Sequence, residues 1–178
     1  LFVQMLRSKN LNYWYIIGFI VGLGMLNKYT MAIPLLSVII GLLVSRKFNV
    51  VFCRQFWIGM SGVLLMMIPN LIWQYNHNWP IFYHLNELDK TQFANIRPIY
   101  FMNMQVLMNS HGMIIWMLGL VGLAAYKPLR TYISIFVAFF LMLITLLLIG
   151  AKPYYMLGIY PILFVFGALY LERLTKNK

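Results

Sequence analysis

Two lysines interrupt long apolar stretches of this chain, and their type and position suit the binding of an anion. Lys28 lies in the polar break LNKYT, and Lys152 lies in the break GAKPYY. An ionisable side chain at such a place costs several kcal/mol to bury unless something pairs with it. Neither segment contains an acid, so we expect an anionic ligand, and a phosphate would suit both lysines. The neighbouring tyrosines could donate hydrogen bonds to its oxygens: Tyr29, Tyr154 and Tyr155.

The alternative is that each lysine only ends a helix and extends its charged group to the lipid headgroups. That interpretation is sufficient for a single lysine at a membrane boundary. Two lysines on the same predicted side, each beside tyrosine, favour an anion site more than one would. The spacing of the residues leaves both interpretations open.

One segment between the apolar stretches, at about residues 74–110, is mixed and polar and does not fit a membrane span. Long loops that join rigid helices often hold functional sites. His84 and Glu87 are three residues apart, with Asp89 nearby, which could suit a metal or acid–base chemistry. The pattern lacks a third ligand at fixed spacing, so we interpret these as solvated loop residues. His77, between two asparagines, could contact a substrate, and we favour a turn residue.

The composition predicts that these segments are held by transmembrane helices. Hydrophobic residues make up 62% of the 178 residues and charged residues only 10%, with a mean hydropathy of +0.79. No water-soluble domain of this size can bury so much apolar surface. We therefore predict an all-α fold, a polytopic transmembrane helical bundle of about six spans in one domain over residues 1–178. The six apolar stretches are roughly 11–27, 30–45, 55–73, 111–126, 131–149 and 154–171.

The distribution of Lys and Arg predicts that both ends of the chain are cytoplasmic. Cytoplasmic loops carry the excess of positive charge. With the N-terminus inside, the outer side holds only Lys28, Lys90, Arg97 and Lys152. The cytoplasmic side then holds Arg7, Lys9, Arg46, Lys47, Arg54, Lys127, Arg130, Arg173, Lys176 and Lys178. The polar segment at about 74–110 becomes an extracytoplasmic loop.

The net charge of +11 does not indicate a nucleic-acid partner. A basic groove needs clustered Lys and Arg on one polar face, whereas these cations stand singly between apolar stretches. The one cysteine, Cys53, has no partner for a disulfide. We expect no nucleic-acid partner, no cofactor and no metal.

Two glycines in the first apolar stretch, Gly18 and Gly22, stand at the GxxxG spacing. This spacing permits close contact between helices in a membrane. We interpret it as a packing feature.

Several strings together resemble a known family. Their order is similar to that in the bacterial membrane glycosyltransferases of the dolichyl-phosphate-mannose protein mannosyltransferase type, which include the aminoarabinose transferases acting on lipid A. Each string alone is weak, but the series is specific and covers nearly the whole chain. The stretch from Phe101 to Gly122, with Gln105 before an apolar run, also resembles that family. The strings are GMLNKYT at 24–30, PNLIWQ at 69–74, HNWP at 77–80, KPYY at 152–155 and YP at 160–161.

The resemblance implies a C-type glycosyltransferase fold that moves a sugar from a polyprenyl-phosphate carrier to an acceptor hydroxyl, lipid or protein, outside the cytoplasm. The lysines matching Lys28 and Lys152 would lie at the carrier phosphate, with Arg97 as a third cation. The aromatic and imidazole side chains of His77 and Trp79 would contact the acceptor side. The implied location is the bacterial inner membrane, with several spans, and the implied partners are the lipid-linked sugar donor, the acceptor and membrane lipids.

One departure from the family pattern concerns the catalytic acid. The resemblance implies an aspartate base in the first outer loop, and this chain contains no matching acidic segment. Glu172 is cytoplasmic in the predicted topology, while Glu87 and Asp89 lie in a later loop. We therefore expect the chain to be a C-terminal fragment that is inactive alone, with the base upstream.

Two other classes of function remain open. A transporter or flippase fragment could use Lys28 and Lys152 to line a path for an anionic or lipid-linked substrate. An internal repeat would favour it, and the two halves show none. A non-catalytic membrane subunit whose outer loop binds a partner is the second.

Overall fold

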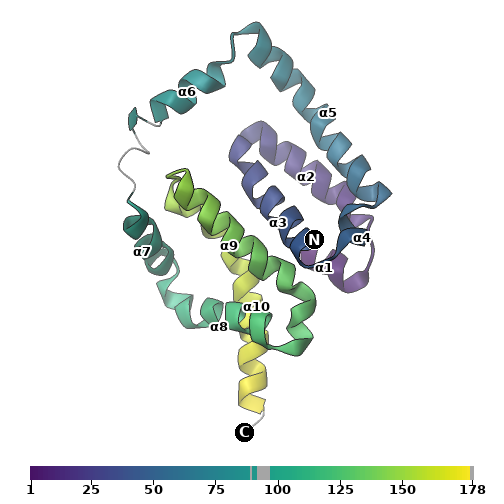
Figure 1. Cartoon of the computed structure of the whole chain (residues 1–178), viewed down its shortest axis with the longest axis vertical. Helices are drawn as coiled ribbons and strands as arrows, with labels where there is room; N and C mark the ends of the chain where they lie inside the picture. The colour runs from purple at the N-terminus through teal and green to yellow at the C-terminus, as the bar shows by residue number, and fades with distance from the viewer. Residues whose placement is uncertain (89, 92–96, 177–178) are drawn as a thin grey trace. The chain divides into compact units, whose positions relative to one another are not determined.

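The computed structural model describes residues 1–88, 90–91 and 97–176, and over these residues all regular secondary structure is helical (Figure 1). The all-α prediction is therefore confirmed. The expectation for Asp89 concerns a residue outside the described ranges. The chain divides into two compact units, Leu1–Thr91 and Gln92–Lys178, and each is described by itself.

The first unit contains the polar break at Lys28. Its elements are α1 (Phe2–Ser8), α2 (Tyr13–Asn27), the 3-10 turn η1 (Tyr29–Met31), α3 (Ala32–Val44), α4 (Phe48–Val51), α5 (Arg54–Asn76) and α6 (Pro80–Leu88).

The second unit contains the break at Lys152. Its elements are α7 (Pro98–Met108), η3 (Ser110–Gly112), α8 (Met113–Ala125), η4 (Lys127–Tyr132), α9 (Ile133–Leu148), η5 (Pro153–Ile159) and α10 (Tyr160–Lys176).

Each of the six predicted apolar stretches contains a helix, but the helices differ in length. Three are long and apolar enough to cross a bilayer: Arg54–Asn76, Lys127–Leu148 and Pro153–Lys176. The helices Tyr13–Asn27 and Tyr29–Val44 are apolar but shorter, because the break at Lys28 falls between them. By length and composition the described residues offer three spans, or four with one bent pair, while the number six stays a prediction.

The bent pair shows how the polar segment differs from a simple loop. Pro98–Met108 and Ser110–Ala125 are together long and apolar enough to cross a bilayer, but the chain bends by 66° between them. The predicted stretch 111–126 is therefore too short alone, and part of the predicted outer loop is helical in α6 and α7. Proline starts both of these helices, as its fixed φ and missing N–H favour.

The first unit is built on a close contact between α2 and α5. A Cβ atom on Gly18 would lie 2.4 Å from the carbonyl oxygen of Gly59, and one on Gly59 would lie 2.5 Å from that of Trp14. Contacts at Gly22 with Met66 follow further along both helices, so the two helices run in the same direction. The GxxxG spacing is thus a packing feature, as predicted.

A buried tryptophan anchors one end of this helix pair. Trp14 is fully buried, its indole Nε1 donates to the carbonyl of Val50 at 2.8 Å, and its ring packs edge-on against Phe56 at 4.9 Å. Met5 and Leu42 complete this core, which therefore joins α1 to α5.

The second unit repeats the same design with α8 and α10. A Cβ atom on Gly119 would lie 2.2 Å from the oxygen of Leu163, and one on Gly167 would lie 1.8 Å from that of Ile115. Trp116, early on α8, packs against Tyr160 at the start of α10, and Tyr126, just after α8, packs against Tyr170 further along α10, so these two helices are also parallel. In a bundle whose spans alternate in direction, the first and third spans run parallel, and so do the fourth and sixth. The pair α2 and α5 and the pair α8 and α10 hold these places in the predicted order of spans.

The α2–α5 contact predicts opposite effects for two alanine substitutions on one helix. Gly59→Ala places a methyl group against backbone that cannot rotate away, so we expect a loss of about 1–3 kcal/mol of stability. Gly62→Ala has no atom within 4 Å of the new Cβ and should be neutral or stabilising by up to about 1 kcal/mol. Thermal unfolding of both variants in the same detergent measures the difference. Equal melting temperatures would contradict the close helix contact.

Candidate functional site

Lys28 lies at the point where α2 ends. Its backbone is extended, with φ −155° and ψ 119°, and its N–H still donates to the carbonyl of Gly24 at 2.8 Å. Its own carbonyl accepts from the N–H of Met31 at 3.0 Å, which starts the η1 turn. The side chain is exposed. The polar break thus holds a lysine at a defined corner between two apolar helices.

A polar network beside this corner joins two of the strings that were identified in the sequence. The Tyr29 hydroxyl donates to Oδ1 of Asn70, and Nε2 of Gln74 donates to the Tyr29 oxygen at 3.2 Å. Gln74 is buried and Tyr29 half-buried. Because α2 and α5 are parallel, the residue after α2 meets the C-terminal part of α5. LNKYT and PNLIWQ therefore form one site in the first unit.

Gln74 also fixes the turn that follows α5. Its side-chain Oε1 accepts from the N–H of Ile81 at 3.3 Å, and its backbone oxygen accepts from the N–H of Trp79 at 2.8 Å. Asn78 and Trp79 both have left-handed backbones, at φ 58° and 55°. A bulky residue such as tryptophan rarely adopts that conformation, so the surrounding hydrogen bonds must hold it.

His77 and Trp79 lie on this turn and are exposed. The His77 ring stacks on Trp73, with centroids 4.4 Å apart and planes at 21°. Its Nδ1 lies 2.8 Å from the carbonyl oxygen of Trp73. These contacts suit the favoured role of His77 as a turn residue. Its role towards an acceptor, like that of Trp79, stays a prediction.

Lys152 precedes the η5 turn in the second unit. It is half-buried and extended, with φ −68° and ψ 135°, and the following Pro153 is buried. The rings of Tyr154 and Tyr155 pack edge-on at 4.8 Å and 89°. The two rings are therefore nearly perpendicular to each other, and Tyr154 is the more exposed of the two.

Gln105 fastens the Lys152 turn to the unit. Its Nε2 donates to the carbonyl of Pro153 at 3.1 Å, and its Oε1 accepts from the hydroxyl of Tyr160 at 3.0 Å. Both side chains are buried, at 4% and 1% exposure. Sequence reasoning noted Gln105 in the family-like stretch but assigned it no role. A lone glutamine in an apolar stretch was the available signal, since a buried amide needs partners.

The remaining candidates are dispersed. Arg97 is exposed and precedes α7, while His84 and Glu87 lie on α6. Among the residues described, no three His, Cys, Asp or Glu side chains are grouped so as to hold a metal ion. Lys28 and Tyr29 belong to the first unit, and Arg97 and Lys152 belong to the second.

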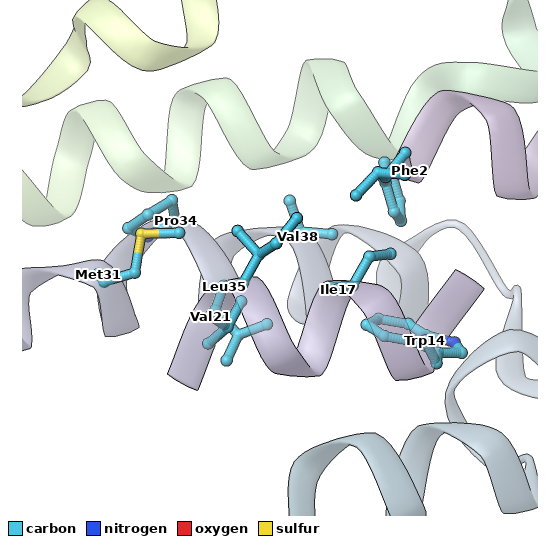
Figure 2. Close-up of a pocket in the computed structure, with 10 residues that line it drawn as sticks. Phe2, Trp14, Ile17, Val21, Met31, Pro34, Leu35 and Val38 are labelled. Atoms are coloured by element: carbon cyan, nitrogen blue, oxygen red, sulfur yellow. The ribbon is translucent and has the colours of Figure 1, made fainter. Parts of the chain in front are cut away.

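An apolar groove lies on the first unit, in a volume of about 220 Å³ (Figure 2). Phe2 comes from α1, Ile17 and Val21 from α2, and Pro34 and Leu35 from α3. The groove offers no charged group, so it suits a hydrocarbon chain and not a sugar or a phosphate. Its full lining is Leu1, Phe2, Trp14, Ile17, Ile20, Val21, Met31, Pro34, Leu35 and Val38.

Comparison with known proteins gives one match. Residues 1–73 match the family model of dolichyl-phosphate-mannose-protein mannosyltransferase. No curated protein and no solved structure matches the chain. The match, together with apolar helices, indicates a membrane location and glycosyltransferase activity in general.

This match supports the family that was suspected from the sequence, over residues 1–73. The matched region contains Lys28, Tyr29 and Asn70 and ends one residue before Gln74. The strings of the second unit lie beyond it.

The Gln105 network predicts a specific loss of stability. Gln105→Leu leaves the Pro153 carbonyl and the buried Tyr160 hydroxyl without their partner, at a cost of about 1–3 kcal/mol. Amide hydrogen exchange at Tyr154 and Tyr155 should also become faster, because the turn loses its tether. Asn103→Leu on the exposed face of α7 is the matched control and should change neither measurement. Unchanged exchange in Gln105→Leu would contradict the tether.

Proposed function

We propose that this chain is part of a multi-pass glycosyltransferase of the bacterial inner membrane that transfers a sugar from a polyprenyl-phosphate carrier to an acceptor on the extracytoplasmic side. The observation that carries the proposal is the Tyr29–Asn70–Gln74 network beside Lys28, which unites two family-like strings. Its first two members and Lys28 lie inside the region that matches the family.

The proposed role of Lys28 is to bind the carrier phosphate. Its ammonium group supplies a positive charge where negative charge grows on the departing phosphate, and fixed donors lower the barrier in a region poor in water. Lys28 leaves α2 at an ordered corner, so the backbone from which its side chain extends is fixed before the substrate arrives. The nearby apolar groove, whose lining includes Met31, gives a hydrocarbon chain a surface on the same unit.

Lys152, with Tyr154 and Tyr155, is proposed to bind phosphate in the second unit, and Arg97 is proposed as a further cation of that unit. The support is the family-like string and the ordered turn that Gln105 holds. A lysine and two hydroxyls at the start of a helical turn can contact separate phosphate oxygens.

The proposed reaction is a direct displacement at the anomeric carbon. The acceptor oxygen forms a bond to that carbon, the bond to the carrier phosphate oxygen breaks, and a carboxylate takes the acceptor proton. We assign the base to a carboxylate outside this chain, which makes the chain alone inactive. Glu172 pairs with Lys176, and Glu87 lies on α6. His77 and Trp79 are proposed to contact the acceptor.

Binding of a polyprenyl phosphate to the purified chain in detergent tests the phosphate site. We expect Lys28→Ala and Lys152→Ala each to weaken binding by about tenfold, the effect of losing one charge-assisted hydrogen bond. Lys90→Ala is the control, because Lys90 is exposed and lies on the same predicted side. Native mass spectrometry or a fluorescent carrier analogue can measure the affinities.

Three results would contradict the proposal. Binding that is equal in all variants would leave the lysines as membrane anchors. Weakening by Lys90→Ala to the same degree would indicate general charge attraction. Measured transport of the carrier by the reconstituted chain, lost in the Lys28 and Lys152 variants, would favour the transporter alternative.

A further inference from the structure

A second charged site lies where α8 and α10 end. The side chains of Tyr126, Leu169, Glu172, Arg173 and Lys176 line a cleft of about 350 Å³. The contacts between α8 and α10 set this cleft, since the helices are parallel and finish at the same end of the second unit. None of these residues belongs to the proposed phosphate site at Lys28 or Lys152.

One cation in the cleft is held in place by an aromatic ring. The Arg173 guanidinium carbon lies 4.3 Å from the centroid of the Tyr126 ring, and that ring packs against Tyr170 at 5.8 Å. A cation over a tyrosine face is attracted by the electron-rich ring. Arg173 therefore has a preferred position, and the outward edge of its guanidinium can still donate to an anion.

The charge of this end is strongly positive. Lys127 and Arg130 are exposed on η4, which starts directly after Tyr126, and they add to Arg173 and Lys176. Glu172 is the only acid in the sequence after residue 89, and it pairs with Lys176. Four cations and one acid leave a local charge of +3.

The position of the cleft identifies the kind of anion. It lies at the ends of two apolar helices, where a spanning helix meets the headgroup layer. Leu169 lines it, and Leu171 and Leu174 on the same helix are exposed at 39% and 44%. Cations next to exposed leucines suit a ligand with an anionic head and hydrocarbon tails.

We propose that this cleft binds the headgroup of an anionic phospholipid, with its phosphate on Arg173, which lines the cleft, and with the basic residues of η4 adding to the local positive charge. The site is independent of the proposed sugar transfer. Basic residues at helix C-termini also complement the helix dipole. A site with only that role would show no preference among lipids and no dependence on the Tyr126 ring.

Native mass spectrometry of the whole chain with phosphatidylglycerol or phosphatidylcholine tests the site. We expect retention of phosphatidylglycerol over phosphatidylcholine, and about fivefold weaker binding in Arg173→Gln. Inorganic phosphate at the same concentration should not compete, since it lacks the tails. Glu172→Gln should strengthen phosphatidylglycerol binding, because it removes a repulsive charge and releases Lys176.

Two substitutions distinguish a specific lipid-binding site from general electrostatic attraction. Tyr126→Leu removes the ring without changing charge and should weaken binding, whereas Tyr126→Phe keeps the ring and should bind as the parent does. Arg7→Gln removes one exposed cation from the first unit and is the charge control. Thermal unfolding checks that every variant is folded. Equal losses in Arg7→Gln and Arg173→Gln, no loss in Tyr126→Leu, or equal retention of the two lipids would each overturn the proposal.

Discussion

Close approach of helix backbones at glycine is the constraint on which both units depend. Lipid tails are as apolar as leucine side chains, so helices in a membrane gain little from hydrophobic burial against each other and must gain from close packing. Gly18 with Gly59, and Gly119 with Gly167, remove the side chains that would separate the helix axes. In each unit the contact joins two helices that run in the same direction.

A parallel helix pair places the ends of both helices together, and the polar chemistry follows from that. In the first unit the residues after α2 meet the last turns of α5, so Tyr29 reaches Asn70 and Gln74 across 41 and 45 residues of sequence. In the second unit Gln105 reaches Pro153 and Tyr160 at the end where α10 begins. The opposite end of that pair carries Arg173 and Tyr126.

The sequence predicted the helices and the breaks because apolar length and lysine-containing interruptions are local signals. It also predicted the packing role of Gly18, because the GxxxG spacing lies within one helix and can be recognised from the sequence of that helix alone. It did not predict Gly59, whose partner lies 41 positions earlier, or the role of Gln105. Such contacts depend on which helices become neighbours. The helical character of α6 and α7 was also missed, because polar residues obscured the two short helices that proline starts.

The scarcity of acids explains why both proposed sites are anion sites. Fourteen Lys and Arg residues face three Asp and Glu residues, so internal pairs can neutralise at most three cations. A charged side chain beside apolar helices must then meet water, backbone carbonyls or an anion from outside the chain. Arg130 shows the second solution, since its Nε donates to the carbonyl of Ala124 at 3.3 Å. Where a cation also has a positioned aromatic neighbour, as Arg173 has in Tyr126, an anion from outside the chain must fit a guanidinium whose place is set, so the third solution gains specificity.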